Sequence, residues 1–167
     1  PVSGGEAGAK QGTLTVMVGG NEIAFERSQK VIQLYSKYSK RMGNSGAGQL
    51  TKMVNQICIA GLVQGLAEGM HFSEQAGLDT KEVIDVISKG AAQSWQMVNR
   101  WETMLEDKYD HGFAVDWMRK DLSYCFNEAK KNNSKLPITK IVDEYYQEVQ
   151  ENGGNRWDTS SLISLLK

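Results

Sequence analysis

The stretch that decides the fold runs from residue 49 to residue 76 and reads QLTKMVNQICIAGLVQGLAEGMHFSEQA. Its apolar residues recur at helical spacing and leave almost no fully polar face. At 1.5 Å per residue, such a helix would be roughly 40 Å long. Because a helix that is apolar nearly all round has to be covered on several sides, the sequence predicts one long central helix with other elements packed around it.

Three glycines, Gly61, Gly65 and Gly69, recur every four residues within this helix. Glycine costs about 1 kcal/mol relative to alanine in a helix interior, so a stripe of three indicates close packing of another backbone. Lys52 and Glu68 in the same stretch argue against a membrane-spanning helix. We therefore expect this stripe to pack between domains or between subunits.

The rest of the chain is predicted to be mainly helical, with a little strand at the start. Apolar periodicity and capping residues predict further helices at about 79–88, 94–107, 115–131 and 137–150, with a short one from residue 158. Upstream, residues 1–3 and 13–18 read as a strand pair, followed by a helix from Asn21 that ends between Tyr38 and Met42. Since two strands alone are marginal in water, we expect the rest of their sheet to precede residue 1.

Composition excludes several classes of function. The 167 residues are 40% hydrophobic and 23% charged, which suits a globular domain, and the net charge of −1 gives no bulk attraction to nucleic acid. No apolar run approaches the roughly 18 to 20 residues of a membrane span. Cys58 and Cys125 lie in apolar helical stretches, which predicts buried thiols in a reducing cytoplasm. The four tryptophans are expected to anchor the core.

The glycine cluster at 43–48 does not form a phosphate-binding loop. Gln49 and Leu50 stand where a Walker loop needs lysine and serine or threonine. The glycine order also differs from the Gly-x-Gly-x-x-Gly dinucleotide fingerprint, which occurs nowhere in the chain. His71 and His111 have no partners at metal-ligand spacing, so no metal site is predicted.

Two polar groups could carry chemistry. Lys52 and Asn55 are three residues apart, which puts an ammonium and an amide on one helix face. A lysine beside an apolar surface loses its proton more easily and can act as general acid or base. Ser3, Gly4 and Gly5 offer a hydroxyl and open backbone N–H groups that suit a carboxylate. From the pattern alone, however, an exposed first helical turn and an ordinary surface turn are the favoured explanations of these residues.

Four sequence motifs that occur in a fixed order along the chain favour the chemical interpretation of Lys52 and Ser3. They are PVSGG at 1–5, GTL at 12–14 with VMVGG at 16–20, GAG at 46–48 followed by Lys52 and Asn55, and KDL at 120–122. Together they resemble the 3-hydroxyisobutyrate dehydrogenase family, which includes tartronate semialdehyde and glyoxylate reductases. The resemblance covers nearly the whole chain, and the opening block is closest to the tartronate semialdehyde reductase branch.

This resemblance implies hydride transfer between NAD or NADP and a small 3-hydroxy or 2-hydroxy acid or the corresponding semialdehyde. Ser3, Gly4 and Gly5 would hold the substrate carboxylate. Lys52 would take the hydroxyl proton during oxidation and return it during reduction.

The resemblance also assigns the remaining site residues. An amide one helical turn after the lysine would help to place the reacting oxygen, and Asn55 is expected to supply it, with Gln56 as the alternative. Lys120 matches the family's lysine near the nicotinamide end of the cofactor, although an ordinary charged helix face would also explain it.

The implied architecture is the all-helical carboxy-terminal domain of a 6-phosphogluconate-dehydrogenase-like fold, built round one long helix. Residues 1–42 would be the terminal strand-turn-strand-helix remnant of the dinucleotide-binding domain. Residues 43–167 would bind substrate and form a homodimer or homotetramer. Because the dinucleotide fingerprint is missing, we expect that domain to precede residue 1 and the 167 residues alone to catalyse nothing.

Two other interpretations remain open at this point. The chain could be a non-catalytic helical dimerisation module descended from the same family. It could also be an unrelated helical ligand-binding domain, in which case the ordered motifs would be a coincidence. A strand followed by Gly-x-Gly-x-x-Gly upstream of Pro1 would favour the enzyme.

Overall fold

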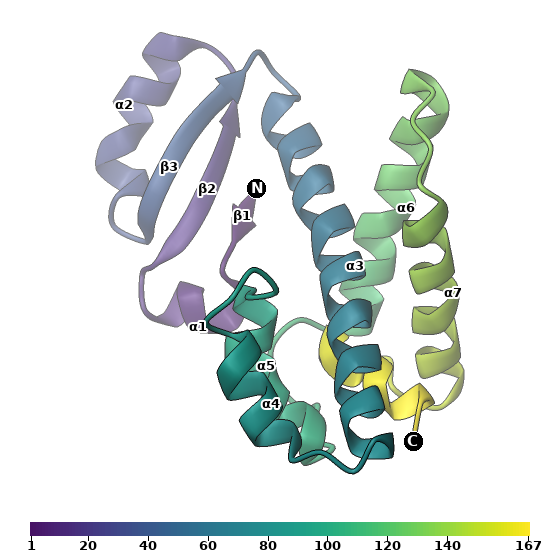
Figure 1. The fold of residues 1–167 in the computed structure, drawn as a ribbon. Coiled ribbons are helices and arrows are strands. Elements are labelled where there is room, and N and C mark those ends of the chain that lie inside the picture. The colour runs from purple at the N-terminus through teal and green to yellow at the C-terminus, as the bar shows by residue number, and fades with distance from the viewer. The chain divides into compact units, whose positions relative to one another are not determined.

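The computed structural model describes residues 1–167, and its internal contacts group them into two compact units (Figure 1). The first unit is Pro1–Gln56 and the second is Ile57–Lys167. The division falls inside the long helix α3, Ala47–Gln75, which confirms the single long helix predicted for residues 49–76. The expected boundary after residue 42 separates functional roles and stays a prediction.

The first unit is built on a three-stranded sheet. Its strands are β1 (Val2–Ser3), β2 (Leu14–Gly19) and β3 (Ser36–Gly43), in the order β1-β2-β3. β1 pairs antiparallel with β2, while β2 pairs parallel with β3 through the crossover helix α2 (Glu22–Ile32). The Asn21 side chain accepts a hydrogen bond from the Ala24 N–H at 3.2 Å, which confirms the predicted start of this helix.

Two parts of this unit differ from the prediction. The helix from Asn21 was expected to end between Tyr38 and Met42, but it ends at Ile32, and Ser36–Gly43 form β3, so the sheet has three strands and not two. Parallel pairing with the apolar strand β2 gives these polar residues backbone partners, and this pairing overrides their weak local preference. The glycine-rich segment expected to be a turn contains a short helix, α1 (Gly5–Lys10).

The second unit is all helical, as expected. After α3 come α4 (Thr80–Ile87), α5 (Trp95–Leu105), α6 (Val115–Asn132), α7 (Pro137–Glu151) and the 3-10 helix η1 (Thr159–Leu165). The Asp79 side chain caps α4 by accepting from the Lys81 and Glu82 N–H groups at 3.0 and 3.3 Å. The residues predicted to begin these helices therefore do so.

The core of this unit lies where the helices meet. α6 packs against α7, and η1 packs against both α7 and α5 (Figure 1). Tyr146 of α7 is fully buried, and its hydroxyl donates to the Thr159 carbonyl at 3.2 Å. Burial, with Asp158 nearby, raises the pKa of Tyr146, so its phenol stays protonated as this donor. Other fully buried side chains include Ala60, Val63, Ala67, Met118, Leu122, Val142 and Ile163.

Two predictions about the core are only partly correct. Cys125 is buried, and burial raises the pKa of its thiol to about 11, but Cys58 is exposed on α3. Trp95 and Trp117 were expected in the core, yet they are 51% and 47% exposed. A cationic side chain lies over each ring, Arg100 over Trp95 at 4.9 Å and Arg156 over Trp117 at 5.5 Å, and helical periodicity alone does not reveal this.

A buried carboxylate ties the loop before α6 to the end of the chain. Asp158 is 1% exposed and accepts hydrogen bonds from the Phe113 N–H at 2.8 Å and from the Ser160 N–H and hydroxyl at 3.0 and 2.6 Å. Arg100 supplies the opposite charge at 3.2 Å, in an ion pair that is not aligned as a hydrogen bond. A buried carboxylate with four partners is strongly stabilising relative to any arrangement that leaves it alone.

This arrangement predicts that Gly112→Ala destabilises the fold more than Gly153→Ala does. Both glycines have positive φ, 71° and 87°, so either substitution costs about 1 kcal/mol through backbone strain. A Cβ at Gly153 meets nothing, whereas one at Gly112 would overlap the Asp158 carboxylate and disturb its ion pair, for a total of about 3 kcal/mol or more. Urea denaturation measures both changes, and equal losses of stability would contradict this account.

Candidate functional site

Helix α3 begins in direct backbone contact with the end of strand β2. A Cβ on Gly48 would lie 2.5 Å from the Met17 carbonyl oxygen and 2.9 Å from the Gly19 nitrogen. A Cβ on Gly19 would meet the Asn44 carbonyl oxygen at 2.7 Å and the Gly48 nitrogen at 2.8 Å. Since real Cβ atoms do not approach this closely, only glycines allow the helix to start here, and this contact fixes where its first turns lie.

The predicted polar residues lie just beyond this contact. Lys52 is half-buried in the second turn of α3, and Asn55 follows it by three residues, so both share one side of the helix. The Asn55 amide N–H donates to the Gln56 side-chain oxygen at 2.7 Å, and Gln56 is 1% exposed. The buried glutamine therefore orients the asparagine, which leaves the Asn55 oxygen available to accept a hydrogen bond.

The serine-glycine turn lies in the same unit. Ser3 ends β1 opposite Thr15 of β2, is half-buried, and its hydroxyl makes no hydrogen bond within the chain. Gly4 and Gly5 follow with φ of 135° and 61°, and no side chain caps the helix that begins at Gly5. The turn thus presents a hydroxyl and unpaired backbone N–H groups, a combination that can bind a carboxylate.

The structure places six of the seven predicted site residues in the first unit: Ser3, Gly4, Gly5, Lys52, Asn55 and Gln56. Lys120 belongs to the second unit, on α6. The helix that carries the lysine and the amides runs without interruption from one unit into the other.

The surroundings of Lys120 contain residues that the sequence did not single out. Its ammonium lies 3.2 Å from Asp121 and 5.4 and 6.0 Å from the ring centres of Trp117 and Tyr124. Arg156 lies over the same Trp117 ring at 5.5 Å. The spacing of Trp117 and Lys120, three residues apart on one helix, was a usable signal. Nothing local in the sequence indicates that Arg156 joins them.

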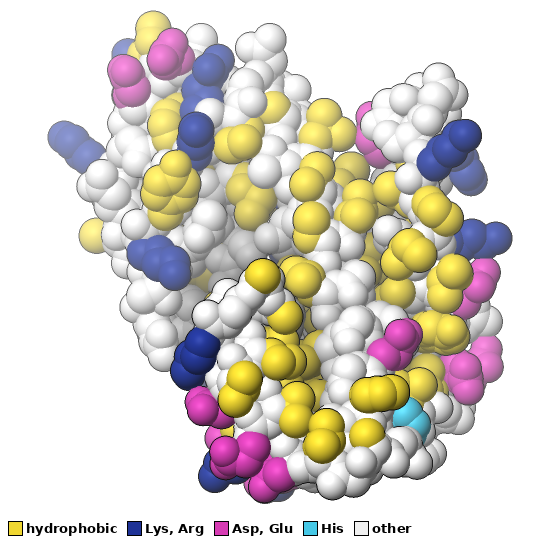
Figure 2. Space-filling model, in the orientation of Figure 1, with side chains coloured by type: hydrophobic (Ala, Val, Ile, Leu, Met, Phe, Trp, Pro, Cys, Tyr) yellow, Lys and Arg dark blue, Asp and Glu magenta, His cyan; other side chains and the backbone are white.

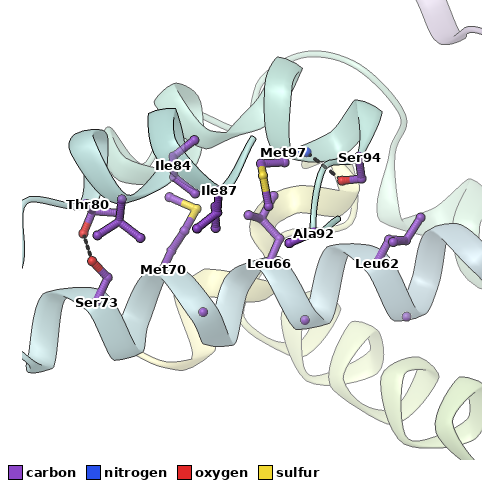
Figure 3. Close-up of a pocket in the computed structure, with 14 residues that line it drawn as sticks. Leu62, Leu66, Met70, Ser73, Thr80, Ile84, Ile87, Ala92, Ser94 and Met97 are labelled. Carbon is purple, nitrogen blue, oxygen red and sulfur yellow. Dashed lines mark hydrogen bonds between the residues drawn. The ribbon is translucent and has the colours of Figure 1, made fainter. Parts of the chain in front are cut away.

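A hollow lies within the helical unit between α3 and the α4–α5 pair (Figure 3). It has a volume of about 300 Å³ and is mostly apolar, with Leu66 and Met70 of α3 facing Ile84 and Met97. Its hydroxyls are already engaged, since Thr80 and Ser73 bond to each other at 3.0 Å. This hollow has no free polar group to orient a small acid, so it is a poor candidate for the reaction site.

Residues 1–167 contain neither a metal-ligand cluster nor a membrane-spanning helix. No three histidine, cysteine or acidic side chains gather as metal ligands. None of the helices has both the length and the apolar character needed to cross a membrane.

Two family descriptions match this chain. The description "NAD-binding of NADP-dependent 3-hydroxyisobutyrate dehydrogenase" matches residues 46–166, and "NAD binding domain of 6-phosphogluconate dehydrogenase" matches residues 1–51. The first match alone covers well over half of the chain and includes Lys52, Asn55, Gln56 and Lys120.

Individual proteins agree with these matches. An uncharacterized oxidoreductase of Shewanella frigidimarina is 61% identical over 100% of this chain and 57% of its own length. The 2-hydroxy-3-oxopropionate reductase of Escherichia coli is 35% identical over 100% of this chain and 57% of its own length. A structure of Mycobacterium tuberculosis 3-hydroxyisobutyrate dehydrogenase with L-serine is 26% identical in sequence and superposes with a TM-score of 0.88. The match covers 100% of this chain and 60% of that structure's chain.

The chain thus spans a little over half the length of the relatives that it matches. Its helical unit, its ordered motifs and its matches all lead to one assignment. The chain belongs to the 3-hydroxyisobutyrate dehydrogenase family, whose members are NAD(P)-dependent oxidoreductases.

Proposed function

We propose that these residues form the substrate-binding and catalytic part of an oxidoreductase that interconverts a small 3-hydroxy or 2-hydroxy acid and its carbonyl form. The observation that carries this proposal is the position of Lys52 and Asn55, on a helix start held against the sheet by glycine contacts. A group that transfers a proton has to be held within hydrogen-bond reach of the reacting atom, and a fixed helix start supplies such precision.

The proposed roles follow the chemistry of each group. Ser3, Gly4 and Gly5 would bind the substrate carboxylate through a hydroxyl and backbone N–H groups. In oxidation, neutral Lys52 would accept the hydroxyl proton while the carbon loses a hydride. In reduction, the Lys52 ammonium would polarise the carbonyl and return the proton. The Asn55 amide, oriented by Gln56, would keep the reacting oxygen in place.

NAD or NADP would supply the hydride acceptor or donor when bound. The residues present fit one end of such a cofactor. The Lys120 ammonium is 46% exposed beside two exposed aromatic rings, so it can meet an anionic or ring-bearing group. They do not include the glycine fingerprint that binds the pyrophosphate, so most cofactor contacts would come from other residues.

The likeness to relatives supports a small acid as substrate. The E. coli relative is named for a hydroxy-oxo acid, and the M. tuberculosis structure contains L-serine, which carries a carboxylate and a 3-hydroxyl. A carboxylate on a small molecule whose second or third carbon bears a hydroxyl group is the feature that the Ser3 turn and Lys52 together would recognise.

We also propose that the helical unit associates with a second copy of the chain. Leu62, Gly65, Gly69 and Phe72 form one exposed face of α3, and a Cβ on either glycine would meet nothing within 4 Å. Figure 2 shows apolar side chains gathered over α3, with the charged ones mostly at the margins. Such a face allows close approach of another helix, and covering it would remove Phe72, 72% exposed, from water.

The 167 residues alone are expected to turn over no substrate, because they lack the pyrophosphate-binding fingerprint. Oxidation of a hydroxy acid by this isolated polypeptide with NAD(P) would contradict that expectation.

Replacing the proposed proton-transfer group tests the reaction directly. In the complete enzyme, Lys52→Met is expected to lower kcat by about 10²- to 10⁴-fold, the usual contribution of a general acid or base. Lys52→Arg keeps the charge but cannot release its proton at neutral pH, so oxidation should stay equally impaired. Steady-state kinetics in both directions with a panel of small semialdehydes, 2-oxo acids and hydroxy acids measures this.

Lys81→Met is the matched control, because Lys81 is exposed on α4 and makes no ion pair. It should leave kcat unchanged. A Lys52→Met enzyme with nearly full kcat would rule out the proposed role of this lysine.

Two substitutions at one glycine test the association. Gly65→Leu should lower the particle mass measured by light scattering, because its bulk would block close helix approach. Gly65→Ala should raise stability by about 1 kcal/mol, since alanine favours helix and its methyl group has open space within the chain. An unchanged mass for Gly65→Leu would show that α3 is not the contact surface.

A further inference from the structure

One side of helix α3 carries small and exposed residues that are spaced symmetrically about Gly65. Cys58, Gly61, Gly65, Gly69 and Phe72 follow one another at intervals of three, four, four and three residues. At 3.6 residues per turn, all five positions lie on one side of the helix. A Cβ on any of the three glycines would meet nothing within 4 Å, while Cys58 is exposed and Phe72 is 72% exposed. These five residues are called the α3 face below.

The apolar hollow of the helical unit opens beside the α3 face. All three glycines line it, and Leu62 stands at one of its ends (Figure 3). The hollow measures about 300 Å³, and the apolar side chains that line it include Leu62 and Ile87, which are 47% and 36% exposed. A second surface laid on the face would therefore also cover the hollow and remove apolar area from water.

The charge and the extent of this surface suit a protein partner. Between the two ends of the face no lysine, arginine or aspartate occurs, and Glu68 is the single acid. Its carboxylate accepts from the Gln64 amide at 2.8 Å. A stable interface buries about 800 Å² on each partner, so a lasting contact has to extend from the α3 face over the hollow. Phe72, Leu62 and Ile87 supply exposed apolar area for such a contact.

We propose that a second copy of this chain covers the α3 face with its own α3, in antiparallel orientation and crossing at Gly65. In a two-fold contact residue i of one copy meets residue j of the other and the reverse, so the surface has to be complementary to itself. The symmetric spacing about Gly65 meets this requirement. Phe72 then lies over Cys58 of the partner subunit, and Leu62 reaches the mouth of the partner's hollow. The arrangement rests on the association proposed above and not on the proposed reaction.

The unequal ends of the face favour the antiparallel orientation over the parallel one. A parallel pair would place two Phe72 rings against each other and so hold the helices apart where the glycines allow close approach. It would also place Glu68 opposite Glu68 of the partner subunit, and like charges repel. In the antiparallel pair each large ring meets a small thiol, and sulfur beside an aromatic ring is a favourable contact.

Disulfide formation in the complete enzyme tests the orientation and the crossing point. Under mild oxidation Phe72→Cys should give a covalent dimer, because the new thiol would face Cys58 of the partner subunit. The wild-type enzyme should form no link through Cys58, since its two copies would lie roughly 21 Å apart along the helix, well beyond the reach of a disulfide. Non-reducing electrophoresis and mass spectrometry of the linked peptides measure both.

Two controls accompany this variant. Cys58→Ser combined with Phe72→Cys removes the partner thiol and should abolish the link. Ile138→Cys places an exposed thiol on α7, outside the α3 face, and should not link to Cys58. Cys125 is buried, so it does not take part.

Exchanged charges provide a second test that needs no oxidation. Cys58→Glu and Phe72→Lys should each lower the particle mass measured by light scattering, because each places an unpaired charge in an apolar contact. The double variant should regain the wild-type mass, since each new carboxylate would face the new ammonium of the other copy. In a parallel pair like charges would meet, and the mass would stay low.

The outcomes separate this arrangement from the other proposals. A link in Phe72→Cys that Cys58→Ser abolishes, with recovery of mass in the double variant, supports it. A link between two Cys58 residues in the wild type, or an unchanged mass for Cys58→Glu, overturns it. If Gly65→Leu lowers the mass but Phe72→Cys forms no link, association through α3 stands and this arrangement is contradicted. If the links form but the complete enzyme oxidises no hydroxy acid, only the proposed reaction is contradicted.

Discussion

The proposed chemistry depends on one backbone contact, that between Gly48 at the start of α3 and Gly19 at the end of β2. A methyl group on either residue would lie less than 3 Å from backbone atoms of the other segment. This contact holds the first turn of α3 against the end of the central strand of a small sheet. Lys52 comes one turn after Gly48, so its position relative to the sheet is set by backbone packing and not by its own side-chain interactions.

The same helix belongs to both units. Its first turns carry the lysine and the amide pair, and its later turns supply the core of the helical unit and an exposed face with two glycines. Lys52 and Asn55 thus lie on regular structure, whereas Ser3 and Gly4 lie where β1 turns into α1.

The sequence predicted the helical unit well, because strong periodicity and clear caps such as Asp79 and Pro137 mark its helices. It failed at β3, whose polar residues become a strand only through pairing with β2. It also could not tell which tryptophans are buried, since burial depends on which elements surround a helix face. The candidate residues Lys52 and Asn55 were found through spacing and family resemblance. Arg156 was not, because it meets Trp117 only after the loop folds back onto α6.

The most direct test is a crystal structure of the complete enzyme with a small hydroxy acid bound. The account predicts the acid's carboxylate on the Ser3 hydroxyl and the Gly4–Gly5 amides, with the Lys52 ammonium within hydrogen-bond distance of the hydroxyl oxygen. An acid bound elsewhere, or a hydroxyl oxygen out of reach of Lys52, would contradict it.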